Sequence, residues 1–137
     1  MEKFATLVYA ILDTKTHQFH YAKAGHTPPL YISGDGTLIK LETGGTILGF
    51  FEDASYKEES LNIAPGDLVV MYSDGITEAE NPDGDQFEEE RLEEVLLENR
   101  ERSAAELIPE ITSAVQQFTG REFQRDDMTL LVMRRTE

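Results

Sequence analysis

The sequence predicts an α+β fold in which an antiparallel sheet precedes two helices and a final strand. Paired strand patterns joined by polar turns occupy the first part of the chain. A helical spacing of apolar residues follows between residues 87 and 118, and two apolar runs, 68–72 and 128–133, flank that region. Short apolar runs rich in β-branched residues are typical of buried strands, whereas a 3.6-residue spacing is typical of amphipathic helices.

The first strands are predicted to form a hairpin. Residues 4–13 are almost continuously apolar, which predicts a central strand. Residues 17–24 alternate, with Phe19 and Tyr21 on one face, which predicts a half-buried strand. The polar turn between these two segments makes the sheet antiparallel.

The next segments predict a second hairpin and an edge strand. Residues 30–32 and 37–40 flank a Ser-Gly-Asp-Gly turn. The glycines at positions 44, 45 and 49 predict an irregular connection, because glycine tolerates positive φ and close backbone approach. Residues 56–63 alternate weakly, as edge strands do.

The two predicted helices have recognisable start and stop signals. Residues 87–96 carry an apolar face, with glutamates in the opening turn that suit the helix dipole. Ser103 and Glu106 form a capping-box pattern that opens the second helix, and Gly120 is a C-terminal stop. The buried stripe of this second helix is predicted to consist of Leu107, Ile111, Val115 and Phe118.

The composition limits the classes of function. A length of 137 residues suits one domain, residues 1–137, and no apolar run is long enough to insert into a membrane. The net charge of −15 argues against nucleic-acid binding and against docking on anionic lipid. The chain has no cysteine, which excludes disulfides and thiol chemistry and is compatible with the expected cytoplasmic location.

Two acidic segments lie at the ends of predicted strands. Asp74, followed by Gly75, stands where the run 68–72 reaches the surface, and Asp126 with Asp127 precedes the last run. If the two strands pair, Asp74 and Asp126 converge on a cation cluster, because Mg²⁺ and Mn²⁺ prefer carboxylate and water oxygens. The alternatives are a tight Asp-Gly turn and a solvated acidic turn, and spacing alone leaves both open.

His26 lies in a predicted loop, residues 24–29, that contains two prolines. Its side chain could be a base or a metal ligand. The favoured alternative is a histidine that fixes the loop through hydrogen bonds.

An ordered set of motifs extends over essentially the whole chain. The motifs are Phe4-Ala5-Thr6-Leu7-Val8-Tyr9 with Leu12-Asp13, Ala24-Gly25-His26 with Pro28-Pro29, Leu48-Gly49, Pro65-Gly66-Asp67, Tyr72-Ser73-Asp74-Gly75-Ile76-Thr77-Glu78-Ala79 and Asp126-Asp127-Met128-Thr129-Leu130-Leu131-Val132. Each motif alone is weak, but the ordered set is specific. By this set the chain resembles the bacterial PP2C-like phosphatases of the SpoIIE and RsbU type.

The resemblance implies a two-layer antiparallel β-sandwich flanked by helices and a serine/threonine phosphoprotein phosphatase that depends on Mn²⁺ or Mg²⁺. In such enzymes two metals share a water and lower its pKa for attack on phosphorus. By motif match, Asp74 and Asp126 would be metal ligands. Asp127 would orient the site or bind outer-sphere water, with Gly75 and His26 as weaker candidates.

The chain also departs from the family pattern. The family carries another metal-binding aspartate in an early Gly-Asp segment, and nothing before Phe4 supplies it. The chain is therefore expected to be the C-terminal portion of the domain, truncated at the N-terminus and poorly active alone. Lys23 occupies a position usually held by Asn, which weakens the assignment of His26.

The resemblance further implies the partners. These are a phosphorylated anti-sigma-factor antagonist-type protein and an upstream sensor or regulatory domain in the parent chain. A missing stretch is expected to uncover a sheet edge or apolar face, which favours self-association, as in a homodimer. The alternative function is a non-catalytic PP2C-like module that binds a partner. A glycosidase is disfavoured, because the chain has no tryptophan for a sugar platform.

Overall fold

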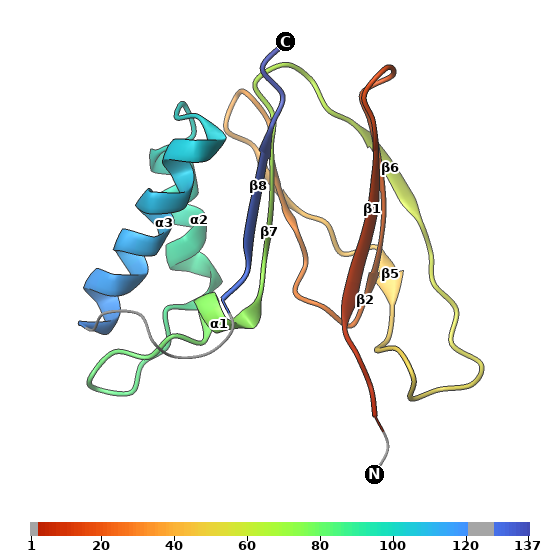
Figure 1. Ribbon diagram of the computed structural model, residues 1–137, viewed down its shortest axis with the longest axis horizontal. Helices are drawn as coiled ribbons and strands as arrows, with labels where there is room; N and C mark the ends of the chain where they lie inside the picture. Colours follow the sequence, from red (N-terminus) through yellow and green to blue (C-terminus); the bar gives the residue numbers. More distant parts are fainter. Residues whose placement is uncertain (1–2, 121–127) are drawn as a thin grey trace.

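The computed structural model describes residues 3–120 and 128–137 and shows two four-stranded sheets packed face to face. Helices cover the outer face of one sheet, and the described chain places no helix on the outer face of the other (Figure 1). The predicted α+β class and the two-layer sandwich are confirmed. No helix in the described ranges has the length and apolarity needed to cross a membrane.

The first sheet is built around β2 (Gln18–Ala24). The strand β1 (Leu7–Asp13) pairs with β2 in antiparallel register, with Leu12 opposite Phe19, so the first predicted hairpin is confirmed. On the other side of β2 lie β6 (Glu59–Asn62), antiparallel, and the two-residue β5 (Gly44–Gly45), parallel. The connection predicted to be irregular at residues 44–49 therefore begins with a short strand.

The prediction of a central strand at residues 4–13 is wrong. Within the described chain β1 has β2 as its one strand partner and lies at the sheet edge. Tyr9 and Ile11 point away from the sandwich and are 62% and 53% exposed. An apolar run predicts a strand but cannot distinguish a buried strand from an edge strand with an uncovered outer face.

The second sheet has the order β4-β3-β7-β8 and is antiparallel throughout. It contains β3 (Leu30–Ile32), β4 (Leu38–Lys40), β7 (Leu68–Tyr72) and β8 (Leu130–Arg134). The strand β7 is central, since β3 and β8 pair with its two sides. The predicted second hairpin and the predicted buried strand β7 are confirmed. The last apolar run forms the predicted strand, β8, but the prediction that this strand is buried is wrong, because β8 lies at the edge of the described sheet and Leu131 is 52% exposed.

The side chains of β7 divide the interior into two cores. Val69 and Met71 face the first sheet and pack in a cluster with Phe19 and Tyr21. Val70 and its alternate neighbours face the helices and join the larger core. This alternation buries both faces of β7, which fixes its register and therefore the position of the residues that follow it.

Three helices follow β7 in the chain. They are α1 (Asp74–Thr77), α2 (Glu88–Glu98) and α3 (Ala104–Thr119). The capping box is present: the Glu106 backbone N–H donates to Ser103 Oγ at 3.2 Å, and the Ser103 N–H donates to Glu106 Oε2 at 2.9 Å. The helix α3 ends at Gly120, whose φ of 66° is left-handed, so both predicted boundary signals are confirmed.

Candidate functional site

Asp74 stands where the central strand β7 passes into α1. Ser73 is the N-cap residue of α1, in an extended conformation, and Asp74 lies in the first turn with its side chain exposed. Two residues later Ile76 is fully buried in the helix-side core and anchors the short helix. The carboxylate therefore has a rigid backbone beneath it and solvent around it, which is the arrangement expected of a metal ligand.

The pairing of β7 with β8 places Ser73, the residue before Asp74, beside Thr129 at the entry to β8. The Ser73 N–H donates to the Thr129 carbonyl at 3.0 Å, and the Thr129 N–H donates to Ser73 Oγ at 2.9 Å. The chain thus enters β8 beside the end of β7. Asp126 and Asp127 lie outside the described residues, so their convergence with Asp74 stays a prediction.

The loop that contains His26 is tied to the same strand end. Thr27 Oγ1 donates to the Tyr72 carbonyl at 2.8 Å, one residue before Ser73. The Nδ1 atom of His26 lies 2.9 Å from the Thr27 carbonyl and 3.1 Å from Thr27 Oγ1. These are the contacts of a histidine that fixes its own loop.

A tight backbone approach explains the glycine before this histidine. Gly25 has a φ of 62°, and a Cβ atom there would lie 2.3 Å from the side chain of Ile47. The Gly25 N–H donates to the Gly45 carbonyl at 3.0 Å. Only glycine fits this position without strain, so Gly25 holds the His26 loop against the residues after β5.

Sequence analysis missed two residues that assemble this end of the sandwich. The Thr27 hydroxyl joins the His26 loop to β7 by its hydrogen bond to the Tyr72 carbonyl. Ser73 Oγ accepts a hydrogen bond from the N–H of Thr129, the residue before β8. A serine before an acidic first turn is a helix N-cap signal, which could have identified Ser73. No local pattern predicts the contact of Thr27 with Tyr72, because the two residues are brought together by the tertiary fold.

Asp74 fits a hard divalent cation as one ligand. Such cations are held by one or two carboxylates together with water. In the ranges that the structure describes, no group of three acidic or histidine side chains could hold a metal ion. Among the described residues Asp74 is therefore a single exposed carboxylate at this strand end, and its role as a metal ligand stays a prediction.

The Pro65-Gly66-Asp67 motif serves the opposite end of β7. Asp67 is 2% exposed and accepts hydrogen bonds from the Ala64 N–H at 2.7 Å, the Gly34 N–H at 2.9 Å and the Tyr31 hydroxyl at 2.6 Å. The pKa of Tyr31 is raised to about 12, mainly because its hydroxyl is buried and secondly because it donates a hydrogen bond to Asp67. This carboxylate joins two turns and is structural.

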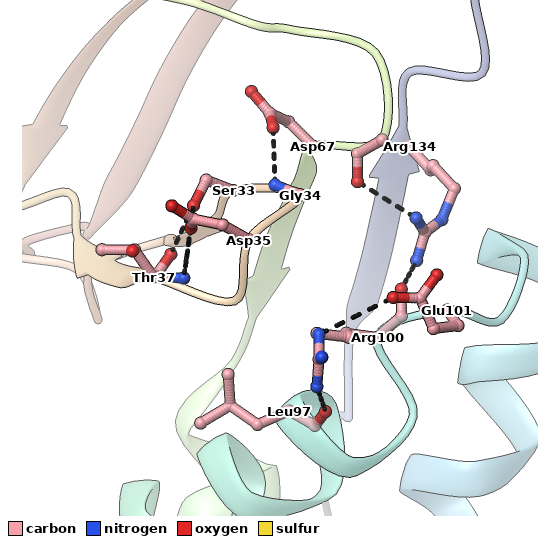
Figure 2. A network of polar contacts seen from close by, with 10 residues as sticks. Ser33, Gly34, Asp35, Thr37, Asp67, Leu97, Arg100, Glu101 and Arg134 are labelled. Carbon is pink, nitrogen blue, oxygen red and sulfur yellow. Dashed lines mark hydrogen bonds and ion pairs between the residues drawn. The ribbon is translucent and has the colours of Figure 1, made fainter.

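A cavity of about 60 Å³ lies beside this motif, lined in part by Arg100 and Arg134. Figure 2 shows the polar contacts of these two arginines. Arg134 donates to the carbonyls of Gly66, at 3.1 Å, and of Arg100. Arg100 donates to the Leu97 carbonyl at 3.3 Å, and its Nε lies 3.7 Å from Glu101. These contacts fasten the α2–α3 turn to β8, so this pair of arginines has a structural role.

Comparison with known proteins finds a family model and relatives that match nearly the whole chain. The family model described as Stage II sporulation protein E (SpoIIE) matches residues 1–136. Phosphoserine phosphatase RsbU of Bacillus subtilis (strain 168) is 37% identical over 134 residues, which cover 96% of this chain and 39% of RsbU. Protein IcfG of Synechocystis is 29% identical over 135 residues, which cover 98% of this chain and 21% of IcfG. The chain spans well under half the length of these relatives.

Solved structures agree in fold. The SpoIIE phosphatase domain of Bacillus subtilis, presoaked with Mn, superposes with a TM-score of 0.73 at 25% identity and covers 97% of this chain and 57% of that domain. The SiaA-PP2C domain of Pseudomonas aeruginosa has a TM-score of 0.77 at 23% identity, covering 94% and 51%. The RsbU and RsbW domains of a Mycobacterium tuberculosis protein give 0.72 at 25% identity, covering 96% and 36%.

Proposed function

This chain belongs to the SpoIIE family of PP2C-like phosphatases, and on that premise we propose that it is part of a metal-dependent serine/threonine phosphoprotein phosphatase. The observation that carries this proposal is the hydrogen-bonded junction of Ser73 with Thr129, which places the entry to β8 beside Asp74. Residues 1–137 form the C-terminal portion of one phosphatase domain in this proposal. The chain covers 51% and 57% of two solved phosphatase domains, which supports its being part of such a domain.

The proposed metal ligands are Asp74 and Asp126, with Asp127 orienting the site. Two Mn²⁺ or Mg²⁺ ions would lower the pKa of a bridging water, which supplies a nucleophile for phosphate-ester hydrolysis. Asp74 holds its carboxylate at the end of the most buried strand, and His26 shapes the adjoining loop. The Mn-presoaked SpoIIE domain, at 25% identity, supports the choice of Mn²⁺.

The proposed substrate is a phosphoserine or phosphothreonine on a partner protein of the anti-sigma-factor antagonist type. The description of RsbU as a phosphoserine phosphatase supports this assignment, as does the structure that joins RsbU and RsbW domains. An upstream sensor or regulatory domain would control the reaction. The short share of the relatives that this chain covers is compatible with such a domain.

A phosphate-release assay tests the proposal directly. A phosphoserine protein is incubated with Mn²⁺ and either this 137-residue chain or the same chain extended upstream in its parent gene. We expect turnover by the extended chain and weak turnover by the short one, because two carboxylates hold a bridged metal pair poorly. Strong turnover by the short chain would refute the expected weakness. No turnover by either chain would favour a non-catalytic binding module.

Replacement of the proposed ligand is a second test. Asp74→Asn removes the negative charge from an exposed side chain, so we expect Mn²⁺ binding by the extended chain to weaken about 10-fold or more, with little change in stability. Isothermal titration calorimetry measures the affinity. Asp83→Asn, at an exposed loop acid, is the matched control. Equal Mn²⁺ affinity of the two variants would show that Asp74 is not a metal ligand.

A further inference from the structure

Two adjacent aromatic side chains lie exposed on the connection between β5 and β6. Phe50 and Phe51 are 52% and 56% exposed, and their rings meet edge to face with centroids 4.8 Å apart. Neighbouring exposed aromatics are uncommon on a protein surface and mark sites of contact with other molecules. Neither residue has a part in the motifs that define the proposed phosphatase site.

The backbone around this pair is held in place. The Leu48 N–H donates to the Ala5 carbonyl at 2.8 Å, and the Ala5 N–H returns a bond to the Leu48 carbonyl at 3.0 Å. On the other side of the pair, the Tyr56 hydroxyl donates to the Ile47 carbonyl at 3.3 Å. A connection fixed at both ends presents its aromatic rings at low cost in conformational entropy.

The same connection is continuous with the proposed phosphatase site. Ile47 packs on Gly25, and two residues further Thr27 bonds the Tyr72 carbonyl at the end of β7. Figure 1 shows the β5–β6 connection and α1 at the end of the sandwich away from the C-terminus, the connection beside the first sheet and α1 beside the second. A protein segment bound with its phosphorylated residue near Asp74 would therefore have the aromatic pair on the same end of the molecule.

The charges beside the pair indicate what kind of segment would fit. Glu52 and Asp53 follow the aromatic residues directly, and both are exposed. An apolar side chain could pack on the rings while a neighbouring Lys or Arg faces the two carboxylates. The chain as a whole carries a net charge of −15, which adds to the attraction for a basic segment.

We infer that Phe50 and Phe51, with Glu52 and Asp53, form a recognition surface for the phosphoprotein substrate. The surface accepts a substrate segment, close to the phosphorylated residue, in which an apolar side chain adjoins a basic one. This inference rests on the proposed phosphatase function and adds the class of sequence that the enzyme prefers.

Peptide binding tests the inference without requiring turnover. Two fluorescent phosphoserine peptides are compared by anisotropy with Mn²⁺ present, one carrying a Leu-Leu-Arg-Arg segment and the other Ser-Ser-Ser-Ser in its place. We expect Phe50→Ala/Phe51→Ala to weaken binding of the first peptide about 10-fold and to leave the second unchanged. Ile108→Ala, at an exposed apolar residue of α3, is the control and should change neither affinity.

Charge reversal gives an independent readout. Glu52→Lys/Asp53→Lys should weaken binding of the Leu-Leu-Arg-Arg peptide and strengthen binding of a Leu-Leu-Glu-Glu peptide, because the attraction changes sign. Equal affinity of the aromatic variant and the unchanged chain for the first peptide would overturn the inference. So would a failure of the unchanged chain to prefer that peptide over the Ser-Ser-Ser-Ser one.

Hydrolysis of p-nitrophenyl phosphate separates the two proposals. This small substrate has no flanking segment, so the aromatic variant of the upstream-extended chain should hydrolyse it at the unchanged rate. Unchanged hydrolysis together with unchanged peptide affinity would refute the recognition surface and leave the phosphatase function standing. If the unchanged extended chain hydrolyses neither this compound nor a phosphoprotein, the phosphatase function itself fails.

Discussion

At the scale of single residues, two aspartates at opposite ends of β7 have opposite surroundings. Asp67 is buried and accepts three hydrogen bonds from turns and from Tyr31. Asp74 is exposed on a rigid strand end. A carboxylate satisfied by protein donors has little left to offer a ligand, whereas an exposed one can bind a cation. Asp67 therefore has a structural role, whereas the role of Asp74 as a metal ligand stays a prediction.

The Tyr31–Asp67 contact predicts a loss of stability in alkali. The pKa of Tyr31 is raised from 10.0 to about 12 in the folded chain. Between these pH values the unfolded chain has released the Tyr31 proton and the folded chain retains it, so the free energy of unfolding falls as pH rises. Urea denaturation across this range measures the slope. Tyr31→Phe should show a shallower decline, and an unchanged slope would contradict the assignment.

At the scale of elements, local sequence signals set the limits of α3. Both halves of the capping box between Ser103 and Glu106 are formed, and Gly120 ends the helix in a left-handed conformation. These contacts satisfy backbone groups that the helix itself leaves without partners. The helix carries Leu107, Ile111 and Val115 into the core against the second sheet. The stability of that layer therefore depends on how the helix begins.

Ser103→Ala is predicted to destabilise the protein by about 1 kcal/mol, because the first turn of α3 loses its side-chain acceptor. Urea or thermal denaturation measures this difference. Ser113→Ala, at an exposed position within the same helix, is the control and should change stability by less than about 0.5 kcal/mol. Equal effects of the two substitutions would show that the cap does not contribute.

At the scale of the whole molecule, the two faces of the sandwich differ. Helices α2 and α3 cover the outer face of the second sheet (Figure 1). In the described chain Tyr9 and Ile11 of the first sheet are exposed. An exposed apolar face beside an unpaired strand edge favours association with another chain. The expectation of an uncovered apolar face is therefore met in the described residues, and self-association remains a prediction.

Tyr9→Thr/Ile11→Thr is predicted to reduce concentration-dependent association, because it removes apolar area while keeping residues that favour strands. Sedimentation velocity over a series of protein concentrations measures the association. Ile39→Thr, at an exposed position on the second sheet, is the control. An unchanged chain that is monomeric at every concentration would contradict the prediction.

Local patterns in the sequence were sufficient to predict most of the elements, but not the two-residue strand β5 or the single-turn helix α1. The alternation of apolar and polar residues predicted β2, the apolar runs predicted β7 and β8, and the capping residues predicted the limits of α3. Each of these signals depends on residues that are close together in the chain. The motif order also predicted the family and the candidate ligand Asp74. These features follow from local backbone preferences and side-chain periodicity.

Only the tertiary structure decided which strands are central and which residues meet. The sequence cannot show that β1 lies at an edge, because an apolar run looks the same whether or not its outer face is covered. It also cannot show that Thr27 bonds Tyr72 or that Ser73 bonds Thr129, since these partners are far apart in the chain. Long-range pairing depends on how all the layers pack together, and that packing determines what surrounds Asp74.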